Sequence, residues 1–228
     1  YLDKMKNIII YTTADKIISL KLVDHIVSDK NFKDWKIDII VKKSTFVRKL
    51  KILFVIFFFG SLKNFLKNLM GEKVSIKQIL KKNPNCKLVK DINKEYDFGL
   101  SVYSSYKIKL QKFKIYNFHL GNLFNQRGSF IFFYKFLKNW SDISLTFHEI
   151  TEKFDVGDIV NERKIELSDK TTATDLIFMY LENLDFLITS VKNIDLKNIS
   201  RLKEYQKLNV VPSFFRLLKE LFIYFFNK

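Results

Sequence analysis

The chain opens with short apolar runs and with longer stretches in which apolar residues recur every three or four positions. Residues 6–12 (KNIIIYT) form a continuous apolar run, which is typical of a strand buried on both faces of a parallel sheet. Residues 14–30 have the apolar spacing of a helix, and residues 35–43 (WKIDIIVKK) predict a second strand. A strand, a helix and a strand in this order predict a parallel βαβ unit with a right-handed crossover.

The remaining chain continues to alternate between these two patterns. Helical segments are predicted over residues 45–70, 74–82, 130–140, 171–194 and 213–228, and strands over 86–90, 96–105, 113–119, 143–150 and 157–167. Thr171 or Thr172 can cap the helix that begins there, and Asp175 lies in its first turn. The order of elements predicts an α/β fold, with a Rossmann-like, mostly parallel sheet flanked by helices. We expect one main domain over residues 1–190 and a small C-terminal helical appendage over residues 191–228.

The composition predicts a folded protein with an anionic partner. The 228 residues are 47% hydrophobic and include 24 Phe and 10 Tyr, which argues against disorder of the whole chain. The formal net charge is +16, which favours nucleic acid, a phosphorylated small molecule or an acidic membrane surface as the partner. The alternative is that an AT-rich coding sequence, which would also enrich Lys, Asn, Ile and Phe, produced this charge without a functional cause.

The cysteine count and the lengths of the apolar runs bear on the cellular compartment, on metal binding and on membrane insertion. The single cysteine, Cys86, excludes an internal disulfide framework and fits a reducing compartment, so we expect a cytoplasmic protein. One cysteine and three histidines argue against a structural zinc site, and no metal is expected. The longest apolar run, residues 52–60, is about half the length that spans a bilayer, so no transmembrane segment is expected. We interpret this run as a buried helical turn or a strand.

The stretch KIYNFHLGNLFNQRGSF (residues 114–130) contains the first candidate chemistry. Asn117 and His119 lie where a predicted strand ends, before a loop that holds two of the six glycines. Ligands of open parallel sheets bind beyond the carboxyl ends of the strands, and residues two apart on a strand point to one side. An amide donor and an imidazole on the same side can hold a carbonyl oxygen that becomes negative in a transition state.

A longer pattern spans NFHLGNLFNQRG (residues 117–128) and LTFHEITEKFDVGDIV (residues 145–160). Asn-x-His is followed by Arg-Gly, then by Thr-x-His, by an Asp seven residues after that His, and by x-Gly-x-Ile. The matching residues are Asn117, His119, Arg127, Gly128, Thr146, His148, Asp155, Gly157 and Ile159. This pattern resembles the signature of the N10-formyltetrahydrofolate-dependent formyltransferases, and the resemblance extends over residues 97–176.

The resemblance implies a mechanism without a metal. An unprotonated amine of the acceptor attacks the formyl group of N10-formyltetrahydrofolate, and Asn117 and His119 stabilise the oxyanion. Asp155 orients His119 or, through water, helps to remove the extra proton of the amine. His148 is expected to support the site or to pack within the sheet. The implied contacts are Ser104, Ser105, Tyr106, Lys107, Ile108, Glu149 and Thr151 for folate, and Gly121 and Arg127 for the acceptor.

The sequence defines the acceptor of the formyl group less closely than it defines the reaction. A methionyl-tRNA formyltransferase normally has a sizeable C-terminal β-barrel domain, whereas the residues after Asp155 are mostly helical in pattern. A glycinamide ribonucleotide enzyme commonly has N-terminal glycines, which residues 8–16 lack. We therefore expect a nucleotide-linked amino sugar, such as a dTDP-linked amino-dideoxyhexose for surface polysaccharide (O-antigen, lipopolysaccharide), whose diphosphate suits basic residues. Arg127 either binds a phosphate or anchors its loop.

A non-enzymatic function is the alternative from another class. A basic protein that binds nucleic acid or an anionic membrane on a degenerate formyltransferase scaffold would also carry the high charge. The intact set of Asn117, His119 and Asp155 argues against it, and no nucleic-acid partner is expected.

The C-terminal segment SFFRLLKELFIYFFNK (residues 213–228) is too apolar to be left bare in a soluble monomer. Three interpretations remain open. The segment packs on its own domain, forms a homodimer interface, or binds a membrane surface through its Phe face and flanking Lys.

Overall fold

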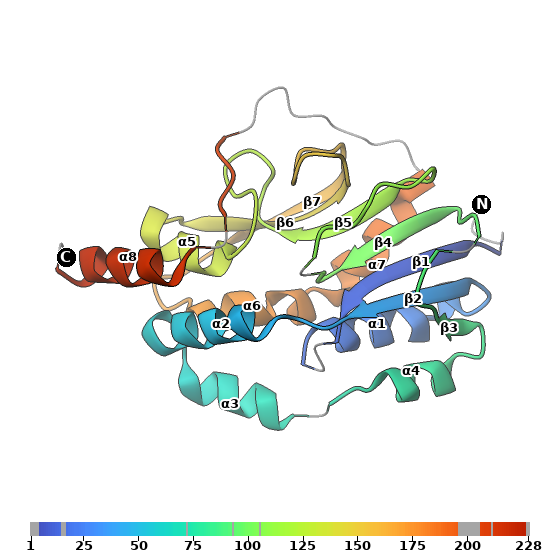
Figure 1. Cartoon of the computed structure of the whole chain (residues 1–228), viewed down its shortest axis with the longest axis horizontal. Coiled ribbons are helices and arrows are strands. Elements are labelled where there is room, and N and C mark those ends of the chain that lie inside the picture. The colour runs from blue at the N-terminus through green and yellow to red at the C-terminus, as the bar shows by residue number, and fades with distance from the viewer. Residues whose placement is uncertain are drawn as a thin grey trace.

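A seven-stranded sheet forms the centre of the molecule (Figure 1). The computed structural model describes residues 5–14, 17–71, 73–92, 94–104, 106–195, 206–210 and 212–226. The strands are β1 (Asn7–Thr13), β2 (Lys36–Lys42), β3 (Cys86–Leu88), β4 (Phe98–Val102), β5 (Ile115–Leu120), β6 (Asp142–Glu149) and β7 (Ile159–Glu166). Their order is β3-β2-β1-β4-β5-β6-β7, with parallel pairs from β3 to β5 and antiparallel pairs from β5 to β7. The mostly parallel α/β sheet expected from the sequence is confirmed.

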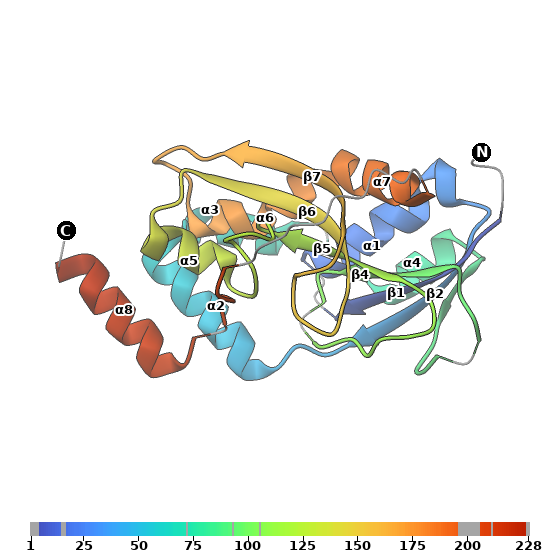
Figure 2. The same cartoon turned by 90° about the horizontal axis from the view of Figure 1, so that it is seen from above.

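Helices cover one side of this sheet and continue beyond one end of it (Figure 1, Figure 2). They are α1 (Ser19–Ser28), α2 (Phe46–Phe59), α3 (Leu62–Met70), α4 (Ile76–Lys82), α5 (Ile131–Lys138), α6 (Ala173–Glu182), α7 (Leu184–Lys192) and α8 (Phe214–Phe226), with 3-10 turns at Lys30–Phe32 and Asn193–Asp195. In Figure 1, α1, α4 and α6 lie below the strands, whereas loops lie above β4 and β5. Seen from above, α8 lies at one end of the molecule, beside α2 (Figure 2).

The two faces of the sheet have different cores. On the helical side, Ile8 of β1 and Phe118 of β5 belong to the main cluster of buried residues, together with side chains from α1, α2, α6 and α7. On the other side, a smaller cluster contains Ile9 and Ile115 and is closed by loop residues such as Ile108. The helical face therefore supplies most of the apolar burial that stabilises the fold.

Two helices that the apolar spacing predicts as continuous are each broken in two. The segment over residues 45–70 breaks before Ser61, whose Oγ caps α3 by accepting a hydrogen bond from a first-turn N–H. The segment over residues 171–194 breaks at Asn183, whose side-chain amide donates to the Met179 carbonyl oxygen at 3.0 Å. Side-chain hydrogen bonds of this kind compete with the next backbone turn, and apolar periodicity does not report them.

The apolar run over residues 52–60 is helical and forms most of α2, but it is buried on one side only. Ile56 and Phe59 pack into the main core. Leu53 is 48% exposed and Phe57 is 70% exposed on the opposite side. The expectation that this run is buried is therefore right for one side of the helix and wrong for the other.

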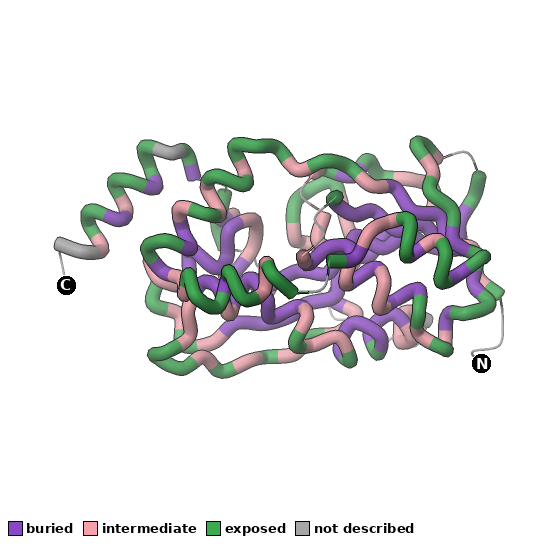
Figure 3. The backbone as a smooth tube through the Cα atoms, turned by 90° about the horizontal axis from the view of Figure 1, so that it is seen from below, coloured by how far each residue is buried: buried purple, intermediate pink, exposed green. Residues whose placement is uncertain are grey.

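The C-terminal helix α8 also packs on its own domain through one side (Figure 3). Leu217 and Leu221 are buried, and the Tyr224 ring lies 5.0 Å from the Phe59 ring of α2. Phe215 remains exposed. The homodimer and membrane interpretations of this segment stay predictions, as does the domain boundary after residue 190, which falls inside α7. Residues 227–228 lie outside the described residues.

The loop between β6 and β7 gives a prediction about stability. Gly157 is buried in this loop, and a Cβ atom there would overlap the Glu149 carbonyl oxygen. Gly157→Ala should therefore lower the melting temperature by about 4–8 °C, because overpacking against fixed backbone costs about 2 kcal/mol. Gly71→Ala is the control, because Gly71 is exposed and its added Cβ would have Asn68 O as nearest neighbour, at 3.3 Å. Equal melting temperatures for the two variants would contradict this close approach.

Candidate active site

Strands β5 and β6 place three polar side chains on the loop-covered face of the sheet. Asn117 and His119 project to the same side as Ile115, because alternate residues of a strand share a face. In the antiparallel register, Asn117 pairs with His148 and His119 pairs with Thr146. Strand pairing therefore brings His148 next to Asn117, although the two residues are far apart in the sequence.

Hydrogen bonds fix the orientation of both imidazoles. His119 Nε2 lies 2.8 Å from the Gln126 carbonyl oxygen, so this nitrogen carries a proton and donates it. His148 Nδ1 donates in the same way to the Glu149 carbonyl oxygen at 2.9 Å. Asn117 Nδ2 lies 3.3 Å from His148 Nε2 and donates one of its two N–H groups to that ring. In a neutral His119 ring, the free lone pair is therefore on Nδ1.

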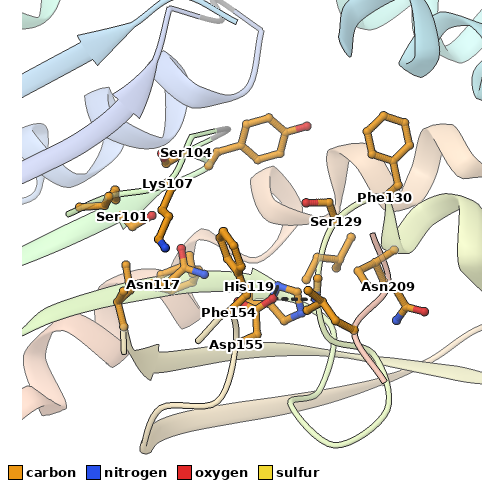
Figure 4. Close-up of a pocket in the computed structure, with 18 of the residues that line it drawn as sticks. Ser101, Ser104, Lys107, Asn117, His119, Ser129, Phe130, Phe154, Asp155 and Asn209 are labelled. Carbon is orange, nitrogen blue, oxygen red and sulfur yellow. Dashed lines mark hydrogen bonds and ion pairs between the residues drawn. The ribbon is translucent and has the colours of Figure 1, made fainter. Parts of the chain in front are cut away.

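The Asp155 carboxylate joins the two histidines. Its Oδ2 accepts a hydrogen bond from the Gly128 N–H at 2.7 Å and lies 3.8 Å from His119 Nδ1. Its Oδ1 lies 3.5 Å from His148 Nε2. Asp155 itself has a φ of +50°, in the left-handed region, which is uncommon for a residue other than glycine. Figure 4 shows Asp155 and His119 directed toward each other.

Burial determines the charge state of this cluster. Burial lowers the pKa of the His119 imidazole below its ordinary value, because desolvation outweighs the attraction of the Asp155 carboxylate. Burial also opposes charge on the Asp155 carboxyl, but His119, His148 and the Gly128 N–H together hold its pKa well below the usual range. The resting site therefore contains a neutral imidazole beside an ionised carboxylate.

A cavity of about 400 Å³ lies in front of these residues, a volume typical of small-molecule sites. Figure 4 shows His119 and Asp155 between two groups of lining residues. The β4 end of the cavity contains Ser101, Ser104 and Lys107, and the Phe130 end contains Ser129, Phe130 and Asn209. Among the described residues, no three His, Cys, Asp or Glu side chains are grouped so as to hold a metal ion.

Most of the predicted folate contacts line the cavity. They are Ser104, Tyr106, Lys107, Ile108 and Thr151. Glu149 does not line the cavity, because its carboxylate pairs with the Lys114 ammonium at 2.6 Å. Ser105 lies outside the described residues. A role in folate binding stays a prediction for all of these residues.

The two predicted acceptor contacts support the site from behind the cavity wall. The Arg127 guanidinium donates to the carbonyl oxygens of Gln206 and Phe154, both at 2.8 Å, so it anchors the loop that carries Asp155. Gly121 has a φ of +134°, and a Cβ atom there would approach His119 Nε2 to 2.9 Å. Neither residue lines the cavity, and the expected contact of each with the acceptor stays a prediction.

Arg48 and Asn209 are two of the polar cavity residues that the sequence did not single out. Arg48, in the first turn of α2, lines the Phe130 end, and its guanidinium carbon lies 5.5 Å from the centre of the Phe130 ring. Burial lowers the pKa of Arg48, which still stays charged at neutral pH. Asn209 reaches the cavity from far along the chain and donates to the Arg127 carbonyl oxygen at 2.9 Å. The available signal for Arg48 was its place in a basic segment that follows a strand of a parallel sheet.

Comparison with known proteins identifies the fold. No protein-family model and no curated protein sequence matches the chain. An N-formyltransferase from Helicobacter canadensis, solved with folinic acid and dTDP-3-aminofucose, matches 91% of this chain and 71% of its own, with a TM-score of 0.59 and 18% identity. This chain has the formyltransferase fold. The fold implied by the sequence motif is therefore confirmed.

Two further solved structures agree with this assignment of the fold. A 4-N formyltransferase from Francisella tularensis matches 91% of this chain and 76% of its own, with a TM-score of 0.55 and 18% identity. HypX from Aquifex aeolicus matches 92% of this chain with a TM-score of 0.55 and 12% identity. The chain spans only 30% of the length of HypX. The activity and substrates of this chain are therefore argued from its own site.

The buried His119 gives a prediction about pH. Unfolding returns its lowered pKa to about 6.5, so below that pH the unfolded state binds more protons and stability falls. The melting temperature should therefore decrease between about pH 7.5 and 5.5 less steeply in His119→Asn than in the wild type. Ile143→Val, which alters a buried residue without removing a titratable group, should keep the wild-type slope. Thermal melts that show one slope for all three proteins would contradict a neutral, buried His119.

Proposed function

We propose that this chain transfers the formyl group of N10-formyltetrahydrofolate to the primary amine of a nucleotide-linked amino sugar. The observation that carries the proposal is the convergence of Asn117, His119 and Asp155 on one cavity. The fold supports it, since the Helicobacter canadensis enzyme was solved with folinic acid and dTDP-3-aminofucose. The acceptor that we propose is a dTDP-linked amino-dideoxyhexose, made in the cytoplasm for surface polysaccharide.

Asn117 is the donor to the developing oxyanion. When the amine attacks the formyl carbon, the formyl oxygen gains negative charge and needs a positioned N–H. The neutral His119 ring already uses its Nε2–H on the Gln126 carbonyl oxygen. Asn117 gives one N–H to His148 and retains a second N–H for the cavity. This assignment is narrower than the shared role of Asn117 and His119 that the sequence motif implies.

His119 is the proton acceptor. Its unprotonated Nδ1 takes the proton that the amine must lose after attack, and the Asp155 carboxylate, 3.8 Å away, stabilises the resulting imidazolium. When the bond between the formyl carbon and the donor nitrogen breaks, the imidazolium returns this proton to that nitrogen. The amine ends as a neutral formamide, and His119 is again neutral.

The β4 end of the cavity suits the folate. Tyr106 and Ile108 offer apolar surface, and residues 106–108 offer backbone groups to the pterin ring. The Lys107 ammonium is exposed, lies 5.9 Å from the centre of the Phe154 ring, and is placed to pair with a carboxylate of the folate tail.

The Phe130 end suits an anionic acceptor. The Arg48 guanidinium lines this end, and in the described part of the chain no carboxylate pairs with it. A partly buried guanidinium without a carboxylate partner is suited to the oxygen atoms of a diphosphate, which it binds with two parallel hydrogen bonds. Glycinamide ribonucleotide also carries a phosphate, and it is the alternative acceptor that the assay must include.

Mass spectrometry tests the reaction directly. Purified protein is incubated with N10-formyltetrahydrofolate and a panel of dTDP- and UDP-linked amino sugars, with glycinamide ribonucleotide and methionyl-tRNA as further acceptors. We expect an amino sugar to gain one formyl group, and Asn117→Ala and His119→Ala each to lower turnover by about 10²–10³-fold. Transfer only to a non-sugar acceptor would contradict the proposed acceptor, and wild-type turnover in either folded variant would contradict the mechanism.

Arg48 gives a separate prediction about the acceptor. Arg48→Gln should raise the KM for the nucleotide sugar about 10–100-fold, because a charge-assisted hydrogen bond to the phosphates is lost. The KM for the folate should change by less than about twofold. Lys49→Gln is the matched control, because Lys49 is exposed and does not line the cavity. An unchanged KM for the nucleotide sugar in Arg48→Gln would place the diphosphate elsewhere.

A further inference from the structure

Helix α2 is apolar on two opposite sides. One side, which includes Ile56, packs into the main core. On the other side, Phe46, Leu50, Leu53 and Phe57 recur at intervals of four, three and four residues, which places them in one stripe. Their exposed fractions are 73%, 47%, 48% and 70%. Large apolar side chains gathered on one exposed helix face are typical of an interaction surface rather than of a random protein surface.

Helix α3, which follows α2 after Gly60, also exposes apolar side chains. Leu62, Leu66 and Met70 recur every four residues and are 52%, 46% and 81% exposed, whereas Phe65 packs into the core. We call the seven residues Phe46, Leu50, Leu53, Phe57, Leu62, Leu66 and Met70 the α2–α3 stripe. No element in the described part of the chain buries it.

The charges that α2 and α3 carry are all of one sign. Lys49, Lys51, Lys63 and Lys67 lie on the same two helices, and the sequence has no acidic residue between Asp38 and Glu72. In the described part of the chain, none of these four lysines pairs with a carboxylate. The surface is therefore both apolar and cationic, and its partner must offer apolar contact together with negative charge.

A second copy of the chain does not meet this requirement. A two-fold interface would bring the same stripe and the same four lysines of both copies face to face. Like charges in such an interface oppose association, and the net charge of +16 adds repulsion between whole molecules. An anionic bilayer surface meets both demands, because apolar side chains enter the boundary between headgroups and acyl chains while Lys pairs with phosphate.

We propose that the α2–α3 stripe docks the protein on an anionic membrane surface. The helices would lie in the plane of the interface, since within the described residues no helix is long and apolar enough to cross a bilayer. Each Lys near such a surface strengthens binding by about fivefold. Because Arg48 of α2 also lines the cavity, docking would hold the Phe130 end of the cavity close to the membrane.

Vesicle sedimentation tests this proposal independently of formyl transfer. Vesicles of phosphatidylcholine alone are compared with vesicles of equimolar phosphatidylcholine and phosphatidylglycerol. Leu50→Ser combined with Leu53→Ser removes two stripe residues that are 47% and 48% exposed. Leu88→Ser combined with Leu110→Ser is the matched control. Leu88 lies on β3 and is 51% exposed, and Leu110 lies in a loop and is 47% exposed. Lys63→Ser combined with Lys67→Ser tests the charge.

The wild type should sediment with anionic vesicles and not with neutral ones, and added salt should weaken its binding. The Leu50/Leu53 variant should lose at least about tenfold in affinity and the Lys63/Lys67 variant about as much, whereas the Leu88/Leu110 control should bind as the wild type does. Equal loss in the stripe and control variants, or no wild-type binding, would overturn the proposal. A concentration-dependent dimer that the Leu50/Leu53 variant abolishes would overturn it in favour of a self-interface.

Formyl transfer in the absence of vesicles is the separate readout. The stripe and control variants should keep the wild-type rate, because none of the substituted residues lines the cavity. Loss of transfer in the Leu50/Leu53 variant would mean that the stripe supports the fold of α2 rather than a membrane contact.

Discussion

The buried carboxylate of Asp155 is the interaction on which the site depends. It accepts a hydrogen bond from the Gly128 N–H and faces His119 and His148. One negative charge therefore lies where β5, β6 and the loops that follow them come together. A buried charge is tolerated only where polar groups compensate for the lost water, and here the Gly128 N–H and the two adjacent imidazoles do so. The same charge favours protonation of His119 at the moment when the amine must lose a proton, which links the architecture to the proposed chemistry.

The catalytic side chains and most of the buried core lie on opposite faces of the sheet. The helical face buries the main core, while the cavity of about 400 Å³ is lined from both sides, by Ile108 of the smaller core and by Ile177 of the main core. Helix α2 contributes to the core, to the cavity and to the solvent-exposed surface. It places Ile56 in the core, Arg48 at the cavity and Phe57 toward solvent. A short segment of sequence thus serves packing, the proposed acceptor site and the proposed membrane contact.

The sequence predicts the central strands well because β1, β2 and β4 are short apolar runs buried in the sheet. It does not predict the break at Asn183, which depends on a side-chain hydrogen bond to the preceding helical turn. Asn117, His119 and Asp155 are recognisable because their spacing forms a motif. Arg48 and Asn209 belong to no motif and reach the cavity through tertiary packing. The basic segment after a strand is the one local signal for Arg48, and no local pattern identifies Asn209.

A crystal structure with 5-formyltetrahydrofolate, which carries the formyl group on the neighbouring nitrogen, tests the central claim most directly. The account predicts the pterin ring at the β4 end of the cavity, with the formyl group facing the catalytic residues and its oxygen about 3 Å from Asn117 Nδ2. It also predicts that His119 Nδ1 remains open toward the Phe130 end. Folate bound outside this cavity, or a formyl group directed away from both Asn117 and His119, would contradict the account.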